Sequence, residues 1–309
     1  MLTSIVVSLA VLIGLFEFAG SYRYDQWKAQ FPDKYDWFGQ LTMPSDNAEL
    51  MWEYWPNASI EFAGATIDTN SHGFRDRERE LAKAPGDLRI VFVGDSVTVG
   101  WGMDAAATFV PLFEAAANRN SPAQVVEALP IAVGGYNAMQ VLELFSARAL
   151  AFSPDIVVYV VCMNDFDFER SSAEKTKFFR KPSSFFLRTV EKVWLKYSGV
   201  NYYDYYYRKN GAAVLAGIGG AKADADARGV DFRVAIMPVF DDDSTEYSLA
   251  EVHNELLDRL AADGVPVIDL LRPFAAQADK LSGYATDGIH LTETGHRIVA
   301  DELVGVLLN

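Results

Sequence analysis

The fold depends on the stretch "RIVFVGDSVTVGWG", residues 89–102. Four apolar residues, Ile90–Val93, run directly into a Gly-Asp-Ser tripeptide that ends at Ser96, which predicts a buried strand followed by a turn. The run has neither the GxGxxG spacing nor the GKS or GKT ending of a phosphate-binding loop. It also lacks the GxSxG nucleophile elbow, because Thr98 stands where the second glycine would be. On these residues alone, Ser96 is a turn residue rather than a nucleophile.

Beyond this strand, apolar strands alternate with helical stretches up to the carboxyl terminus. The segment "DIVVYVV", residues 155–161, is apolar on both faces, as a central parallel strand requires. The alternation predicts an α/β fold with a parallel sheet flanked by helices. The predicted strands are 89–94, 124–127, 155–161, 232–237 and 265–269, and the predicted helices are 106–119, 138–151, 212–228, 247–263 and 293–308.

The composition fits a compact globular protein. The chain has 309 residues, half of them hydrophobic and 13% aromatic, which is enough for one large domain or two small ones. Its net charge of −15 argues against a nucleic-acid partner, because phosphate binding needs a positive surface. Cys162 is the single cysteine, so an internal disulfide and a Cys-rich metal site are excluded. We expect it to pack as a small hydrophobe.

The amino terminus carries a nearly unbroken apolar stretch, Leu2–Phe16. No lysine or arginine precedes it, and the residues around Phe18 form a poor signal-peptidase site. We therefore expect residues 1–20 to be an uncleaved membrane anchor, with a cleaved signal and a buried core helix as the alternatives. Three basic residues follow the span, and by loop charge alone they would hold that side in the cytoplasm. They are Arg23, Lys28 and Lys34.

Residues 21–87 form the predicted link between this segment and the main domain, 88–309. The first part is rich in tyrosine and tryptophan, which suits either a membrane interface or a solvated linker. The stretch "ASIEFAGATIDTNSHGFRD" then predicts two short strands in a hairpin closed by Asn70, Ser71 and Gly73.

A segment at about 171–210 interrupts the α/β alternation. It holds nine lysines and arginines against three acidic residues, interleaved with phenylalanines, Trp194 and a tyrosine cluster at 202–207. Such a basic and aromatic insertion could be a lid over the site, or could face a membrane or a protein partner. The alternative is an ordinary helical excursion with a solvated basic face.

The stretch "YATDGIHLTETGH" near the carboxyl terminus contains a candidate catalytic pair. Asp287 and His290 lie three residues apart on a loop before a helix. At that spacing the carboxylate can hold the Nδ1 proton of the imidazole, which leaves Nε2 to accept a proton from a serine. We interpret the other three histidines as structural. These are His72 in a turn, His253 in a predicted amphipathic helix and His296 in the last helix.

Two further stretches lie where an acyl transfer would need hydrogen-bond donors. In "VGGYNAMQ", Gly134 and Gly135 follow an apolar run and precede a helix, so a backbone N–H could approach a ligand closely. In "CMNDFD", Asn164 follows the central strand, at the edge where open α/β sheets bind ligands. Its amide could donate to a developing oxyanion. Taken singly, the glycines predict a tight turn and Asn164 predicts a cap.

Together, these blocks in this order resemble those of the SGNH (GDSL-type) hydrolase superfamily, over about residues 88–308. The resemblance implies a three-layer α/β/α sandwich with a central, mainly parallel sheet, preceded here by an N-terminal hydrophobic helix. By position, it makes Ser96 the nucleophile, with Asp287 and His290 as orienting acid and base. It makes the oxyanion hole from Ser96, Gly135 and Asn164. The third block usually reads Gly-x-Asn-Asp, whereas this chain has Cys162 in place of the glycine.

The prelude "IDTNSHGFRDRE" and the hydrophobic amino terminus also resemble a membrane-anchored bacterial subgroup of these proteins. The resemblance implies a serine esterase that forms an acyl-enzyme, with a small-molecule or glycan ester as substrate. The alternatives are an O-acetyltransferase acting on a cell-envelope polysaccharide and a non-catalytic, membrane-anchored binding subunit. A membrane-protein partner is possible in the transferase reading, and the catalytic domain is expected outside the cytoplasm, or secreted if the signal is cleaved.

We expect neither a cofactor nor a metal. The three aspartates at 241–243 predict a solvated loop rather than a ligand cluster, because three adjacent side chains rarely converge on one ion.

Overall fold

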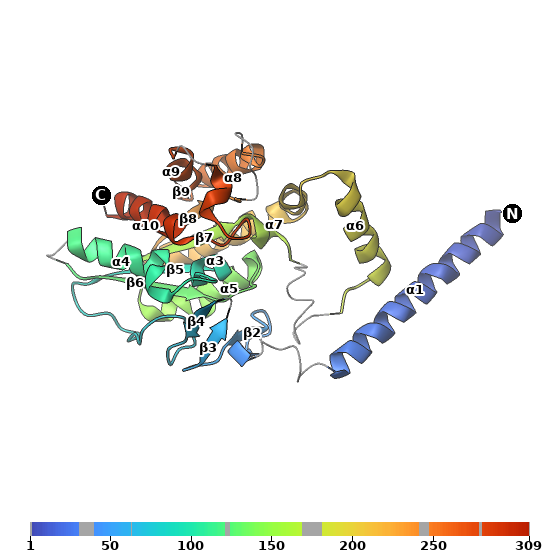
Figure 1. Cartoon of the computed structure of the whole chain (residues 1–309), viewed down its shortest axis with the longest axis horizontal. Coiled ribbons are helices and arrows are strands. Elements are labelled where there is room, and N and C mark those ends of the chain that lie inside the picture. The colour runs from blue at the N-terminus through green and yellow to red at the C-terminus, as the bar shows by residue number, and fades with distance from the viewer. Residues whose placement is uncertain are drawn as a thin grey trace.

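The computed structural model describes residues 2–30, 40–62, 64–120, 124–168, 181–240, 247–277 and 280–308. Its centre is a five-stranded parallel sheet in the order β6-β5-β7-β8-β9 (Figure 1). The strands are β5 (Leu88–Gly94), β6 (Val126–Ala132), β7 (Ile156–Cys162), β8 (Asp231–Met237) and β9 (Val267–Asp269). All seven residues of β7 are buried, in accordance with the two-sided apolar pattern of its sequence.

Helices follow the strands in alternation. They are α3 (Ser96–Val99), α4 (Phe109–Asn120), α5 (Ala138–Ala147), α6 (Phe185–Ser198), α7 (Tyr202–Ala227), α8 (Ala250–Ala262), α9 (Leu271–Ala275) and α10 (Glu293–Leu307). Short 3-10 turns are η1 (Ala105–Ala107), η2 (Ala149–Phe152), η3 (Met163–Phe166) and η5 (Leu281–Tyr284).

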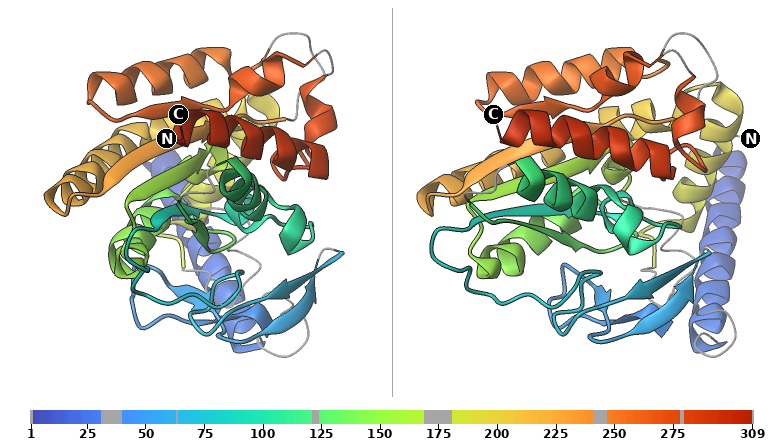
Figure 2. Two further views of the ribbon diagram at one scale, coloured as in Figure 1. Left: turned by 90° about the vertical axis from the view of Figure 1, so that its left-hand side faces the viewer. Right: turned by 60° about the vertical axis from the view of Figure 1, so that its left-hand side comes forward.

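The helices cover both faces of the sheet and form a three-layer α/β/α sandwich (Figure 2). On one face, residues of α4, α9 and α10 pack with alternate strand residues such as Phe92 and Val158. On the other face, residues of α5, α7 and α8 pack with the intervening residues, such as Val91 and Val157. This alternation across the strands confirms the predicted α/β fold class.

The chain reverses its direction across the sheet at β5. From β5 it moves to β6 on one side, and then crosses to β7 on the other side of β5. The two connections lie on opposite faces, because α4, between β5 and β6, packs on one face and α5, between β6 and β7, packs on the other. A crevice forms at such a switch point, outside the carboxyl ends of the strands. Ser96 follows β5 directly and Asn164 follows β7.

The prediction for the second strand was wrong in its bounds: β6 runs over Val126–Ala132 rather than 124–127. Pro130 lies inside it and pairs with Phe92. Proline cannot donate to a sheet ladder, so it reads as the end of a strand. Here β6 is an edge strand of the five-stranded sheet, and the missing N–H leaves no neighbour unpaired.

The helix predicted at 212–228 begins ten residues earlier, at Tyr202. Asn201 caps it by accepting hydrogen bonds from the Tyr203 and Asp204 amides, at 2.9 and 3.4 Å. Part of the tyrosine cluster therefore belongs to a core helix, with Tyr206 and Tyr207 buried. The other predicted strands and helices lie within a few residues of the observed bounds, although the last strand begins at Val267 instead of 265.

The region before the sheet forms two small antiparallel ribbons. One pairs β1 (Thr42–Pro44) with β2 (Trp52–Tyr54), and the other pairs β3 (Ser59–Phe62) with β4 (Ala65–Asp68). The predicted hairpin exists, but the residues between Phe62 and Ala65 join its strands. Asn70, Ser71 and Gly73 instead form a separate turn after it, in which the Gly73 amide donates to the Asn70 carbonyl.

The amino-terminal helix α1 (Leu2–Gln30) projects away from the sheet domain (Figure 1). Within it, Ser4–Gln26 is long and apolar enough to cross a membrane. None of the most apolar window is buried, so the alternative of a buried core helix is wrong. Lys34 and the Asp241–Asp243 loop lie outside the described residues.

Candidate active site

Ser96 lies at the turn that joins β5 to the short helix α3. Gly94 ends the strand where a Cβ atom would lie 2.1 Å from the Thr98 hydroxyl, so the turn requires glycine there. Asp95 is the N-cap of α3, and its Oδ1 accepts a hydrogen bond from the Val97 amide at 3.0 Å. The turn thus fixes Ser96 at the first helical position, where its N–H has no intrahelical acceptor.

Ser96, His290 and Asp287 form a connected chain of hydrogen bonds. The Ser96 Oγ lies 2.8 Å from His290 Nε2, and His290 Nδ1 lies 2.7 Å from Asp287 Oδ2. The serine and the histidine are 194 residues apart in sequence, so the fold brings them together. In the tautomer with the proton on Nδ1, the imidazole donates to the carboxylate and accepts from the serine hydroxyl.

Hydrogen bonds within the loop before α10 fix the orientation of His290. The second oxygen of Asp287 accepts the His290 amide at 3.0 Å, and the Thr286 amide donates to the His290 carbonyl at 2.8 Å. Partial burial raises the pKa of Asp287, but hydrogen bonds from the His290 side chain and amide outweigh it and lower the pKa below the usual value. The Asp287 carboxylate therefore stays ionised, and remains a hydrogen-bond acceptor for the imidazole, down to acidic pH.

The two glycines after β6 differ in their hydrogen bonds. The Gly134 amide donates to the Tyr54 hydroxyl at 2.7 Å. Within the described chain, no acceptor lies within reach of the Gly135 amide. Gly135 has a φ of +82°, in the left-handed region that favours glycine, and it lines a cavity. Of the two backbone donors left open by the sequence, the geometry therefore favours Gly135.

Asn164 lies on η3, directly after β7, and is held by the residue beside the serine. Its Nδ2 donates to Asp95 Oδ2 at 2.9 Å, which fixes the orientation of the amide group. Cys162, where the SGNH pattern has glycine, has a φ of −111°, which any residue adopts. The departure from the usual block therefore places no strain on the turn that carries Asn164.

A tryptophan also borders the histidine. The Trp101 ring stacks on the His290 ring with 6.3 Å between centroids and 26° between planes. Arg75 holds the turn that carries this tryptophan. Its guanidinium donates to the carbonyls of Gly100 and Met103, at 2.9 and 2.7 Å.

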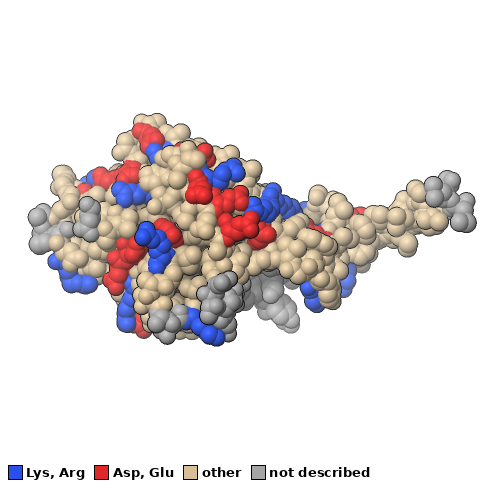
Figure 3. All heavy atoms as spheres, turned by 90° about the horizontal axis from the view of Figure 1, so that it is seen from above, with Lys and Arg blue, Asp and Glu red and all other residues tan. Residues whose placement is uncertain are grey.

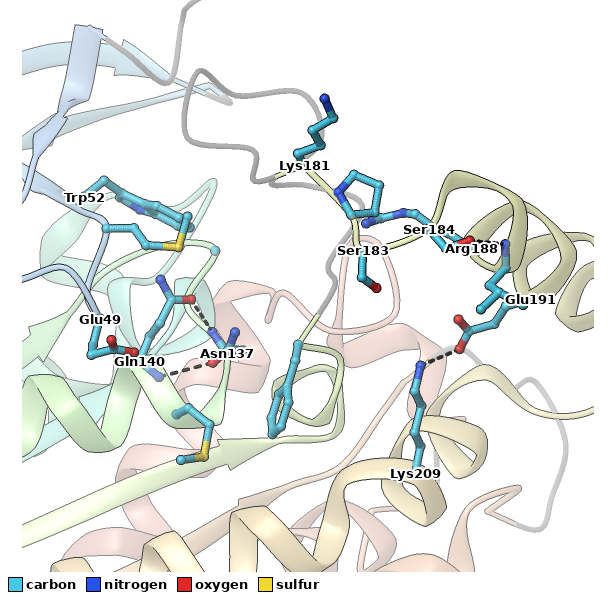
Figure 4. Close-up of a pocket in the computed structure, with 16 residues that line it drawn as sticks. Glu49, Trp52, Asn137, Gln140, Lys181, Ser183, Ser184, Arg188, Glu191 and Lys209 are labelled. Atoms are coloured by element: carbon cyan, nitrogen blue, oxygen red, sulfur yellow. Dashed lines mark hydrogen bonds and ion pairs between the residues drawn. The ribbon is translucent and has the colours of Figure 1, made fainter. Parts of the chain in front are cut away.

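A cavity of about 660 Å³ opens beside Gly135 (Figure 4). Trp52, Asn137 and Gln140 form one wall, and α6 and α7 contribute the opposite wall with Arg188 and Lys209 among others. The cavity combines aromatic, amide and charged side chains, and of the candidate site residues it is lined by Gly135 rather than by Ser96, Asn164 or His290.

The three remaining histidines have structural contacts. His72 Nε2 lies 2.9 Å from the Arg79 carbonyl, and His253 Nε2 lies 2.8 Å from Asp269 Oδ1. His296 Nδ1 accepts the Phe109 amide at 3.2 Å, and burial lowers its pKa to about 3. Cys162 is buried as expected. Among the described residues, no group of three or more His, Cys, Asp or Glu side chains is arranged to hold a metal ion.

The sequence did not single out Asp95, Tyr54 or Trp101. Asp95 carried a usable signal, because an aspartate before a short helical run is a common N-cap. The contacts of Tyr54 and Trp101 join segments far apart in the sequence, and no local pattern predicts them.

A three-layer sheet domain with a Ser-His-Asp chain at its switch point defines a serine hydrolase class of protein. Residues 92–298 match the GDSL-like lipase/acylhydrolase family, and the chain belongs to that family. It is thus an SGNH-type enzyme that acts on ester bonds, as a hydrolase or a related O-acyltransferase.

Solved structures with a similar fold include three esterase or lipolytic proteins. One is a member of the lipolytic G-D-S-L family from Veillonella parvula, with 15% identity, a TM-score of 0.46 and coverage of 72% of this chain and 99% of that chain. The acetyl xylan esterase AlAXEase has 15% identity, a TM-score of 0.46 and coverage of 71% and 100%. The psychrotrophic esterase EstA from Pseudoalteromonas has 12% identity, a TM-score of 0.46 and coverage of 72% and 97%. A comparison with curated protein sequences finds no match.

Proposed function

We propose that the chain is a serine esterase that cleaves carboxylic esters through an acyl-enzyme on Ser96. The observation that carries the proposal is the continuous Ser96–His290–Asp287 hydrogen-bond chain, with distances of 2.8 and 2.7 Å. At these distances a proton can pass from the serine hydroxyl to the imidazole, and the carboxylate can hold the imidazole in place.

In this mechanism, the Ser96 oxygen attacks the ester carbonyl while His290 Nε2 takes the hydroxyl proton. The oxyanion accepts hydrogen bonds from the Ser96 amide, the Gly135 amide and the Asn164 side chain. His290 then gives the proton to the departing alcohol, and the ester C–O bond breaks. A water molecule attacks the acyl-enzyme with His290 again as base, which releases the acid and regenerates Ser96.

The hydrogen bonds of the free protein support this division of roles. Tyr54 accepts the Gly134 amide, so the neighbouring Gly135 amide is the donor that remains for a ligand. Asp95 takes one amide hydrogen of Asn164 and directs the other away from itself. Asp287 is ionised at neutral pH and stabilises the imidazolium that forms during attack.

Hydrolysis of p-nitrophenyl acetate tests the proposal. The Ser96→Ala variant should lose turnover by about 10⁴-fold or more, since the nucleophile is removed. Ser146→Ala is the matched control, because Ser146 is exposed on α5 and its hydroxyl lies near carbonyls of its own helix. Turnover by Ser96→Ala equal to that of the control would refute the assignment.

A second candidate is an O-acetyltransferase that passes the acyl group to a sugar hydroxyl. The cavity beside Gly135 is compatible with it, because about 660 Å³ lined by Trp52 and amide side chains suits a glycan acceptor as well as an ester. Product analysis separates the two functions: with a polysaccharide present, acetylated glycan in excess of free acetate identifies the transferase. A non-catalytic binding subunit is consistent only with an absence of both products.

We also propose that residues 1–20 anchor the protein and that residues 88–309 form the catalytic domain outside the cytoplasm. The exposed apolar surface of α1 supports the anchor, and the resemblance to anchored bacterial relatives supports the orientation. The basic residues after the span favour the opposite orientation. A carboxyl-terminal alkaline phosphatase fusion tests the orientation of the anchor. Phosphatase activity would place the domain outside the cytoplasm, and a well-expressed fusion without phosphatase activity would place it inside.

A further inference from the structure

Helix α6 carries an exposed apolar stripe on the side opposite the cavity beside Gly135. Phe186, Val190, Val193 and Tyr197 recur at the spacing of one helical face. Val193 is 52% exposed and Tyr197 is 75% exposed. No side chain of α6 is buried. Leu195 packs on the core and Glu191 bonds α7, so these residues hold α6 to the domain while its apolar stripe is left uncovered.

The flank of this stripe is basic. Lys192 and Lys196 are exposed on α6 beside the apolar residues, in a chain whose net charge is −15. A helix with large aromatic and aliphatic residues on one face and lysines on the adjacent face has the composition of helices that lie in a membrane interface. Lysines in that position pair with anionic headgroups.

Helix α6 begins against the apolar helix α1. The Glu17 carboxylate accepts hydrogen bonds from the Phe185 and Phe186 amides, at 2.9 and 3.1 Å, and from the Ser184 hydroxyl. Phe16 and Phe186 meet edge to face with 6.0 Å between centroids. The start of α6 is therefore fixed to one level of α1.

That level corresponds to the edge region of a bilayer. The apolar run of α1 covers Leu2–Phe16, and Glu17 is the first charged residue of the helix. The run is about 22 Å long, and a bilayer accommodates such a short span by local thinning. Because an ionised side chain is costly in hydrocarbon, the boundary of the core lies near Glu17. Figure 3 shows the projecting part of α1 beyond the body as a rod almost free of charged side chains. Its exposed surface continues into the α6 stripe through Phe16 and Phe186.

We propose that α6 lies in the interface of the bilayer that α1 crosses, with its apolar stripe in the acyl-chain boundary and its lysines at anionic headgroups. The other side of α6 lines the cavity that reaches Gly135, through residues that include Leu187, Arg188 and Glu191. The cavity then opens beside the lipid surface. The inference rests on the proposed anchoring by α1 and is independent of the ester chemistry at Ser96.

Spin labels on the full-length chain test the proposal in vesicles of phosphatidylcholine and phosphatidylglycerol. Val193→Cys and Tyr197→Cys place the label on the stripe, and Lys192→Cys is the matched control on the basic flank. Cys162 is buried, and the unmodified chain reports any background labelling. We expect a several-fold higher ratio of oxygen to nickel-chelate accessibility at the two stripe positions than at the control. Equal ratios at all three positions overturn the proposal.

Two further measurements test whether a second copy of the chain covers the stripe, and whether the chain without cysteine substitutions places α6 in the bilayer. Dipolar broadening at position 193 that disappears when unlabelled chain is added would show a second copy on the stripe, and would overturn the membrane assignment. In the unmodified chain, a diazirine on a phospholipid acyl chain should label residues 185–198 as well as α1. Labelling of α1 without labelling of 185–198 contradicts the proposal. Ester hydrolysis by the same vesicles reports separately on the function of Ser96.

Discussion

Replacement of Asp95 tests how the oxyanion donors are positioned. This carboxylate is fully buried and uses its oxygens for different partners. Oδ1 accepts the Val97 amide at 3.0 Å, and Oδ2 accepts Asn164 Nδ2 at 2.9 Å. Asp95→Ala removes both acceptors, whereas Asp95→Asn keeps the shape and a single oxygen. Since one oxygen cannot face two donors, the asparagine variant should lie between the wild type and the alanine variant.

The expected size of the effect follows from the role of Asn164. Loss of one oxyanion donor lowers kcat by about 10²–10³. Asp95→Ala leaves the Asn164 amide present but without its fixed partner, so its loss should approach that range without exceeding it. The unpaired buried donors should also lower the free energy of unfolding by about 1–3 kcal/mol.

A double-mutant cycle with Asn164→Ala separates positioning from other effects. We measure kcat and KM for p-nitrophenyl acetate in the two single variants and the double variant, and the free energy of unfolding by urea. If Asp95 acts through Asn164, then Asp95→Ala should cause no further loss of kcat in the Asn164→Ala background. Losses that multiply in the double variant would refute the reasoning.

Three other changes test separate parts of the structure. Tyr54→Phe should lower kcat by about tenfold and stability by about 1–3 kcal/mol, because the Gly134 amide loses its acceptor; wild-type turnover would contradict the role of this bond. For His296, whose pKa is about 3 when folded, stability should fall below pH 6.5 by about 1.4 kcal/mol per pH unit, because the unfolded histidine binds a proton that the folded one does not. His296→Asn, which retains an acceptor at the Nδ1 position, should remove about one proton from that slope in urea titrations, and an unchanged slope would sink the argument. Gly94→Ala should abolish activity or folding, since its Cβ would meet the Thr98 hydroxyl at 2.1 Å; near-normal hydrolysis would show that the turn can relax.

The sequence predicted those parts of the fold whose signal is local. β5 and β7 are buried on both faces and read as unbroken apolar runs, so their positions were predicted within one residue. β6 was truncated because Pro130 reads as a terminator, and only its place at the sheet edge makes the proline tolerable. The start of α7 was missed because its first turns consist of tyrosines, which pack on the core although they are weak helix formers.

In the candidate site, too, features with a local sequence pattern were predicted, whereas contacts between distant segments were not. The proposed nucleophile, acid and base were assigned from ordered sequence blocks. The Asp287–His290 contact could be expected from a spacing of three residues. The choice of Gly135 over Gly134 came from the resemblance alone, and its physical basis could not be predicted from the sequence. It depends on the hydroxyl of Tyr54, which lies 80 residues before Gly134 and reaches it only in the folded chain.

The residues that precede the family match therefore contribute to the active site. The match covers residues 92–298, yet Tyr54 lies before that region and holds the loop of the proposed oxyanion donor. Arg75 also lies before it and holds the turn that carries Trp101 against the catalytic histidine. Both side chains are almost fully buried, so the two ribbons before the sheet cannot separate from the domain without exposing these contacts. The segment before the sheet is thus a structural part of the proposed esterase site.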